Sequence, residues 1–114
     1  MTERETHIGR TQSLFRSVNE RIAASSDRLG SDQTEIVCEC PDQTCTERVE
    51  LPLEQYEEVR EQPTRFVVRP GHEDPSVGKV VEWHRGFEIV EKVHRAAAKV
   101  ARQLDPRRAE PSGV

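Results

Sequence analysis

Three cysteines lie within eight consecutive residues, as Cys38-x-Cys40-x4-Cys45, and this cluster constrains the fold more than any other feature. Thiolates are preferred ligands of zinc. Cysteines two apart on a strand point to the same side, so both can reach one ion. Cys45 follows a turn at residues 41–44 and can supply a third ligand. A structural zinc ion needs four ligands, so we expect one more from elsewhere in the chain.

The candidates for this fourth ligand are the four histidines, His7, His72, His84 and His94. His7 lies in a segment without apolar periodicity, and His94 lies on a C-terminal helical segment far from the cysteines. Asp42, inside the cysteine turn, is a lesser alternative. The choice is therefore mainly between His72 and His84.

The direction of the predicted strand 64–69 decides between these two in a simple sheet. If this strand runs parallel to strand 35–40, its end delivers His72 to the cysteine turn, and His84 lies at the far end. If strand 64–69 runs antiparallel to strand 35–40, His84 lies at the cysteine turn instead, and His72 lies at the far end. We favour His72, because the Pro70-Gly71 turn frees its imidazole from the strand ladder, and loops on a rigid scaffold often carry such sites.

The cysteines also admit other interpretations. They could be ordinary buried small side chains, or a redox pair with a third, resolving thiol. An iron–sulfur cluster would need a further ligand, from a histidine or from another chain. Glu39, Asp42 and Glu47 oppose thiolate formation near the cysteines, which weighs against the redox interpretation.

The composition favours a domain that needs a bound metal ion for its stability. The chain has 114 residues, of which 33% are apolar and 33% are charged, so it can bury only a thin core. Its net charge of −4 weighs against a nucleic-acid partner. No apolar run is long enough to span a membrane, and MTERETHIGR lacks the apolar segment of a secretory signal. We therefore expect a cytoplasmic protein whose partner is another protein.

The first predicted helix begins near residue 11 and ends at Gly30. Its apolar stripe consists of Leu14, Phe15, Val18, Ile22 and Leu29, which recur at helical spacing. The opposite face, with Arg16 and Asn19, is expected to face solvent. Residues 1–10 are expected to form a mobile arm.

The rest of the chain reads as short strands and helices separated by proline and glycine. Strands are predicted over 35–40, 46–52, 64–69, 79–84 and 86–92, and helices over 53–62 and 93–104. The fold class is thus α+β, with a mixed or antiparallel sheet of about five strands. We expect one zinc-stapled domain over residues 11–105 and a frayed tail over 106–114.

No catalytic constellation is present in the pattern. The serines lack a nucleophile-elbow context, the glycines form no phosphate loop, and the glutamates at 54, 57, 58 and 61 fit a solvated helix face. We therefore assign no catalytic residue, and an enzyme is the less favoured class.

Several segments together resemble a family of short uncharacterised bacterial proteins. These segments are FRSVNERI, CECPDQTC, YEEVREQPTRFVVRPGHE and VVEWHRGFEIVEK. The resemblance implies a stand-alone cytosolic protein in which the cysteines and the PGH loop belong together, and it implies no activity.

These observations leave three hypotheses. The first is a zinc-stabilised interaction or regulatory module with ligands Cys38, Cys40, Cys45 and His72. The second is a thiol redox protein or sensor that uses the same cysteines. The third is a nucleic-acid-binding zinc domain, suggested by the basic C-terminal stretch.

Overall fold

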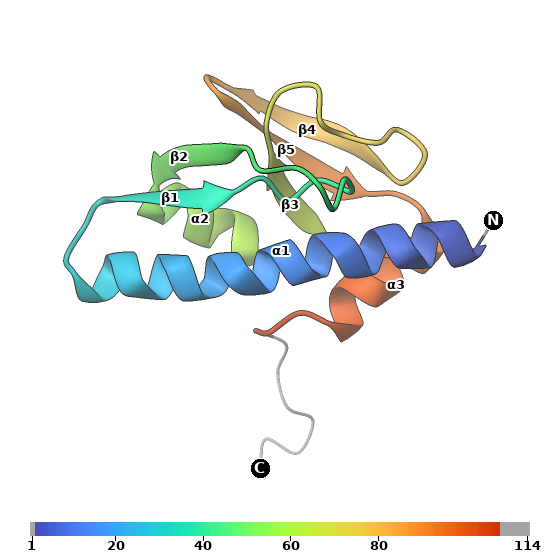
Figure 1. The fold of residues 1–114 in the computed structure, drawn as a ribbon, viewed down its shortest axis with the longest axis horizontal. Helices are drawn as coiled ribbons and strands as arrows, with labels where there is room; N and C mark the ends of the chain where they lie inside the picture. Colours follow the sequence, from blue (N-terminus) through green and yellow to red (C-terminus); the bar gives the residue numbers. More distant parts are fainter. Residues whose placement is uncertain (1, 108–114) are drawn as a thin grey trace, which may run out of the picture.

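The computed structural model describes residues 2–107, which form three helices and five strands in the predicted α+β class (Figure 1). The elements are α1 (Thr2–Arg28), β1 (Gln33–Val37), β2 (Arg48–Pro52), α2 (Leu53–Arg60), β3 (Arg65–Val68), β4 (Gly78–His84), β5 (Phe87–Lys92) and α3 (Arg95–Gln103). Residues 108–114 of the expected frayed tail lie outside the described part.

The strands form two sheets instead of the single sheet that we expected. β1 pairs with β2, and the other three strands follow the order β3-β5-β4. All strand pairs within the sheets are antiparallel. The two sheets are joined beyond the end of β1, where the Glu39 N–H donates to the carbonyl of Val67 on β3 at 2.8 Å.

The first helix is longer than the sequence pattern indicated. Residues expected to form an arm are helical from Thr2 onward, and Ile8 is buried against Val77 and Ala97. Acidic residues in the first turn suit the positive end of the helix dipole. The predicted end at Gly30 is confirmed, because this residue adopts a φ of 72° and its N–H caps the carbonyl of Asp27.

The predicted orientation of this helix is wrong for most of its apolar stripe, although Ile22 packs against the core as expected. Leu14, Val18 and Leu29 are exposed, by 64%, 41% and 85% of their surface, whereas Arg16 and Asn19 are fully buried. The buried face of α1 is polar because it covers irregular backbone, whose carbonyls and N–H groups need partners.

Two apolar clusters make up most of the core. The first joins β1, β2, α2 and the three-stranded sheet through Ile36, Val49, Leu51, Tyr56, Val59, Val67, Phe87 and Ile89. The second, which we call the cysteine cluster, consists of Cys38, Cys40, Phe66, Val68, Val90 and Ala101. α1 runs beneath both sheets, and α3 packs beside its N-terminal half (Figure 1). Over residues 2–107, no helix combines the length and apolar character needed to cross a bilayer.

Candidate metal centre

Two cysteines lie on the extension of β1 beyond Val37. The Cys38 N–H donates to the carbonyl of Glu47, and the Glu39 N–H donates to that of Val67, so the segment is fixed on both edges. The alternation of an extended chain then turns Cys38 and Cys40 into the cysteine cluster. Each of these two side chains is 1% exposed.

The third cysteine is placed by the turn that follows. The Asp42 carboxylate accepts hydrogen bonds from the N–H and the hydroxyl of Thr44, at 2.9 and 2.6 Å. The Cys45 N–H then donates to the Asp42 carbonyl. This Asx-type turn reverses the chain and brings Cys45, which is half-buried, back toward the other two thiols.

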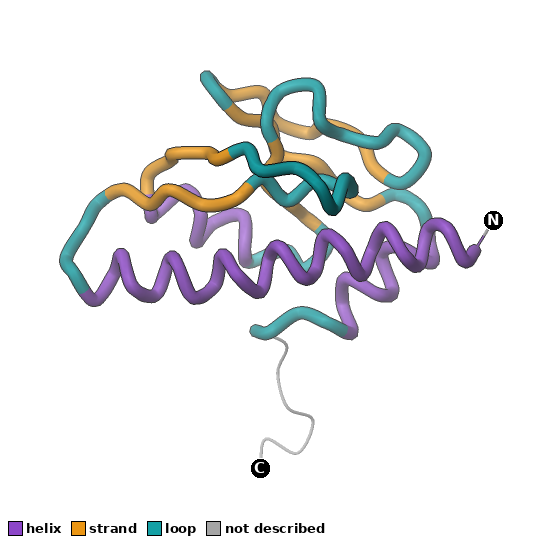
Figure 2. Tube along the Cα trace, in the orientation of Figure 1, coloured by secondary structure: helices purple, strands orange, loops and turns teal. Residues whose placement is uncertain are grey.

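The predicted histidine comes from the loop after β3. The His72 N–H donates to the Arg69 carbonyl across a turn, and Gly71 takes a φ of 83° that favours glycine. The turn removes His72 from the strand ladder, as the Pro70-Gly71 pair indicated. Figure 2 shows that the segments carrying Cys45 and His72 are both loops, whereas strands flank them.

The four side chains converge on one point. Their ligand atoms all lie within 4.8 Å of one another. His72 Nδ1 lies 3.6 Å from Cys38 Sγ and 3.7 Å from Cys45 Sγ. Zinc bonds of about 2.3 Å to sulfur and about 2.0 Å to nitrogen give a sulfur–nitrogen edge of about 3.5 Å in a tetrahedron, close to these two distances. The residues present therefore fit a tetrahedral metal ion with three sulfur ligands and one nitrogen ligand.

Burial disfavours the deprotonated, negatively charged form of Cys38 and Cys40. It raises the pKa of Cys38 above its ordinary value, although the Arg69 N–H, 3.2 Å from the sulfur, acts in the other direction. Burial likewise raises the pKa of Cys40. Deprotonated thiols in this cluster therefore need a nearby positive charge, which a bound divalent cation supplies.

A layer of polar side chains from α1 supports this segment, and the sequence pattern did not reveal it. Asn19 Nδ2 donates to the Val37 carbonyl and to the Glu39 carboxylate, and Asn19 Oδ1 accepts from the Val37 N–H, all at 2.8 Å. Gln12 donates to the Glu39 carbonyl, also at 2.8 Å. Burial raises the pKa of Glu39, against the hydrogen bonds from Asn19 and the Val67 N–H. The backbone around the cysteines is thus fixed by buried amides.

The other candidates for the fourth ligand are engaged elsewhere. His84 Nε2 lies 2.8 Å from Glu82 Oε1, and its ring stacks on Phe87 at 4.6 Å. His94 caps the start of α3 by accepting from the Ala96 N–H. His7 is exposed on α1, and the Asp42 carboxylate accepts a hydrogen bond from the Thr44 N–H within the turn.

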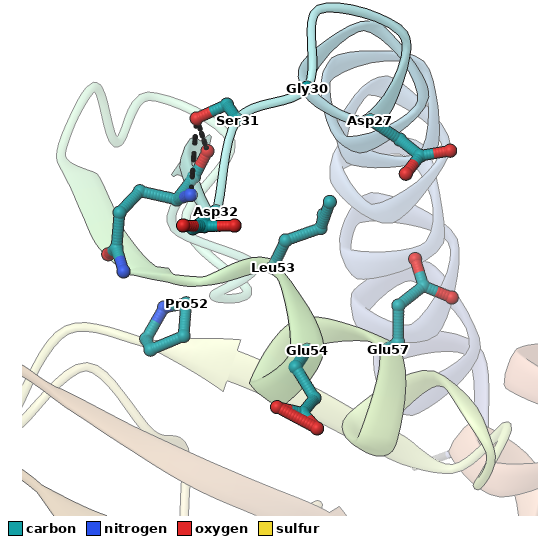
Figure 3. A pocket seen from close by; sticks show the side chains of 9 residues that line it. Asp27, Gly30, Ser31, Asp32, Pro52, Leu53, Glu54 and Glu57 are labelled. Carbon is teal, nitrogen blue, oxygen red and sulfur yellow. Dashed lines mark hydrogen bonds between the residues drawn. The ribbon is translucent and has the colours of Figure 1, made fainter.

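A hollow lies away from the cysteines, between the end of α1 and the start of α2 (Figure 3). It has a volume of about 550 Å³, and its lining includes the carboxylates Asp27, Asp32, Glu54 and Glu57 around Leu53. Glu57 is neutralised by Arg107, at 2.7 Å. None of the cysteines and histidines lines it, so it adds no ligand or nucleophile to the metal centre.

Comparison with other proteins gives no family for the chain. No protein-family model matches it, and neither the curated proteins nor the solved structures include a match. The cluster of Cys38, Cys40, Cys45 and His72 agrees with the motif on which the resemblance to short bacterial proteins depends.

Proposed function

We propose that this protein is a zinc-binding module whose Cys38, Cys40, Cys45 and His72 hold one structural zinc ion. The observation that carries the proposal is the approach of three thiols and one imidazole nitrogen to within 4.8 Å of one another. Three sulfur ligands and one nitrogen ligand at tetrahedral spacing are typical of structural zinc. Four protein ligands fill the tetrahedron, so the ion has no open position for a substrate or a water nucleophile.

Metal analysis tests this proposal directly. The protein, purified under reducing conditions, is expected to carry one zinc ion per chain by native mass spectrometry and elemental analysis. X-ray absorption should report three sulfur neighbours at about 2.3 Å and one nitrogen neighbour at about 2.0 Å. Reduced protein without metal, a visible iron–sulfur spectrum, or a coordinated water in place of His72 would each overturn it.

The proposal includes an interaction role, which the outer face of α1 and α3 supports. A shallow hollow of about 360 Å³ there is lined by Arg10, Ser13, Leu14, Ser17 and Leu104. Leu14 and Leu104 are exposed by 64% and 46%. Arg10 is the only charged residue of this lining, and α3 contains no acidic residue. The chemistry fits a partner protein that presents an apolar side chain beside a carboxylate.

Cross-linking in the native cell tests this role with two matched variants of α1. Leu14→Glu places a carboxylate in the hollow and should abolish capture of a partner that the parent protein captures. Leu29→Glu changes an equally apolar and more exposed side chain directly after the last residue of α1, so capture should persist. Equal capture by both variants would remove this face as the contact surface.

A further inference from the structure

The four ligands of the metal centre differ in their access to solvent. Cys38 and Cys40 are buried in the cysteine cluster against Phe66, whereas Cys45 and His72 are half-buried on loops. Phe66 is itself fully buried, so a small reagent cannot approach the inner sulfurs from that side. The sulfur atom of Cys45 is therefore the one that a dissolved oxidant reaches first.

Hydrogen bonding distinguishes Cys38 from the other two sulfurs. The Arg69 N–H donates to Cys38 Sγ at 3.2 Å, and such a bond stabilises the negative charge on a thiolate and so lowers its intrinsic nucleophilicity. Within residues 2–107, no backbone N–H donates to Cys45 Sγ, whose neighbours are His72 Nδ1 and the Cys40 thiol. Hydrogen bonding thus disfavours Cys38, and exposure favours Cys45 over Cys40.

We propose that Cys45 is an oxidative modification site of the metal centre, where hydrogen peroxide attacks and a disulfide with Cys40 then forms. This inference rests on the proposed zinc site. Cys40 is the partner because only the turn at residues 41–44 separates it from Cys45, whereas Cys38 is tied to the Arg69 N–H. Since all ligand atoms lie within 4.8 Å, a small movement of the turn suffices to form an S–S bond of about 2.0 Å.

The reaction takes two steps. The Cys45 thiolate attacks one peroxide oxygen, the O–O bond breaks, and the departing hydroxide takes a proton to give water and a sulfenic acid. The Cys40 thiolate then attacks the Cys45 sulfur, the S–O bond breaks, and a second hydroxide leaves and is protonated. In total, two thiolates lose two electrons, and one peroxide takes up two protons to become two waters.

The product retains two of the four ligands, Cys38 and His72, which is too few for a structural zinc ion. Zinc is therefore released, and the loops of Cys45 and His72 lose their common anchor. The structural ion thereby makes the conformation of these loops sensitive to peroxide, and a reductant together with zinc restores it.

Peptide mapping of the zinc-loaded protein tests the order of events. Hydrogen peroxide is added, zinc release is followed with a chromophoric chelator, and the free thiols are alkylated at intervals and identified by mass spectrometry. Cys45 should be the first thiol lost, the disulfide should join it to Cys40, and zinc should appear at the same rate. Dithiothreitol with zinc should reverse all three changes.

A variant adds an independent readout. Cys45→His offers zinc an imidazole instead of the reactive thiolate, and where it loads zinc, peroxide should release the ion at least about tenfold more slowly. Metal retained by oxidised parent protein, or Cys38 modified first, would overturn this inference alone. Reduced parent protein without zinc would overturn the proposed function, and mapping of the parent decides even if the variant does not fold.

Discussion

A single buried amide, Asn19, contacts the backbone on which the first cysteine depends. It pairs with both the N–H and the carbonyl of Val37 and also donates to the Glu39 carboxylate. Asn19 and Glu39 are fully buried, and Val37 is half-buried. Asn19 therefore positions Cys38 and Cys40 without touching a ligand atom.

Replacing this amide should be costly. Asn19→Leu keeps the branched shape of the side chain but leaves the Val37 N–H, its carbonyl and one oxygen of the buried Glu39 carboxylate unpaired, so the free energy of unfolding should fall by about 2–4 kcal/mol. Zinc affinity should fall as well, because the cysteine backbone loses its support. Val18→Ala, one residue away but exposed, should change stability by less than about 0.5 kcal/mol. Chemical denaturation and a zinc competition titration measure both quantities, and similar values for the two variants would contradict this account.

The two histidines that competed for the fourth position should respond differently. His72→Ala removes an imidazole that lies 3.6 Å from a thiol, so zinc content should drop and the melting temperature should fall by about 10 °C or more. His84→Ala removes only the Glu82 contact and the Phe87 stack and should keep the full zinc content. Elemental analysis and thermal unfolding give the readouts. Loss of zinc from the His84 variant instead would refute the assignment.

Among the elements, α1 shows where sequence patterns succeed and fail. Its end was predicted correctly because Gly30 supplies a local signal. Its buried face was predicted incorrectly because the middle of that face pairs polar side chains with backbone groups of other segments. Arg16, for example, donates to the carbonyls of Pro63 and Ala101 and lies 4.5 Å over the Phe66 ring. Such contacts depend on distant segments, which periodicity along the helix does not report.

The cysteine and histidine cluster was predictable for the opposite reason. Its determinants are local: alternation along β1, the turn chemistry of Asp42, and the glycine at position 71. The division of the strands into two sheets was not predictable, because the length of each strand and the crossing point at Glu39 depend on tertiary contacts.

The packing of α1 against α3 depends on a residue without a side chain. A Cβ atom at Gly9 would lie 3.1 Å from Val100 Cβ and 3.4 Å from the Ala97 carbonyl. Gly9→Leu should therefore push the two helices apart and lower the free energy of unfolding by about 1–3 kcal/mol, despite leucine's better helix propensity. Ala24→Leu on the exposed side of the same helix is the control and should be nearly neutral. A Gly9→Leu protein as stable as its parent in urea denaturation would show that α3 does not pack here.

Considered as a whole, the molecule buries several ionisable side chains close to the candidate metal centre. Lys92 is 5% exposed, and its Nζ lies 4.9 Å from the centre of the Phe66 ring that Arg16 also contacts. Burial lowers the pKa of Lys92 from 10.5 to about 7. The unfolded chain therefore binds more protons than the folded protein between these pH values, and stability should rise as the pH increases from 7 toward 10.5.

Lys92→Met tests this pH dependence. The variant replaces the ammonium group with an apolar end of similar length, so the rise in unfolding free energy across this range, on the order of 2–4 kcal/mol in the parent, should be lost. At pH 7 the variant should be at least as stable as the parent. Lys79→Met, on the exposed side of β4, should retain the parental slope. Parallel curves for all three zinc-loaded proteins in denaturant titrations from pH 7 to 10 would exclude this role of Lys92.

Removal of the metal should divide the molecule along its two apolar clusters. Structural zinc contributes apparent binding energy on the order of 10 kcal/mol in small domains, comparable to the whole stability of a typical fold. Cys38 and Cys40 belong to one cluster, whereas the other, around Ile36, Leu51 and Tyr56, contains no cysteine. Chelation should therefore loosen the cysteine cluster first and leave the pairing of β1 with β2 largely intact.

Amide hydrogen exchange distinguishes this outcome from global unfolding. After chelation, the amides of Glu39 and Arg69 should lose protection, because their acceptors, the Val67 carbonyl and Cys38 Sγ, belong to the segments that the metal joins. Amides in the β1–β2 ladder should exchange more slowly than those of Glu39 and Arg69. Readdition of zinc should restore the protection of the Glu39 and Arg69 amides. Uniform loss of protection would mean that the ion stabilises the entire fold as one unit. Unchanged protection at Glu39 and Arg69 would mean that the four side chains do not hold a structural ion.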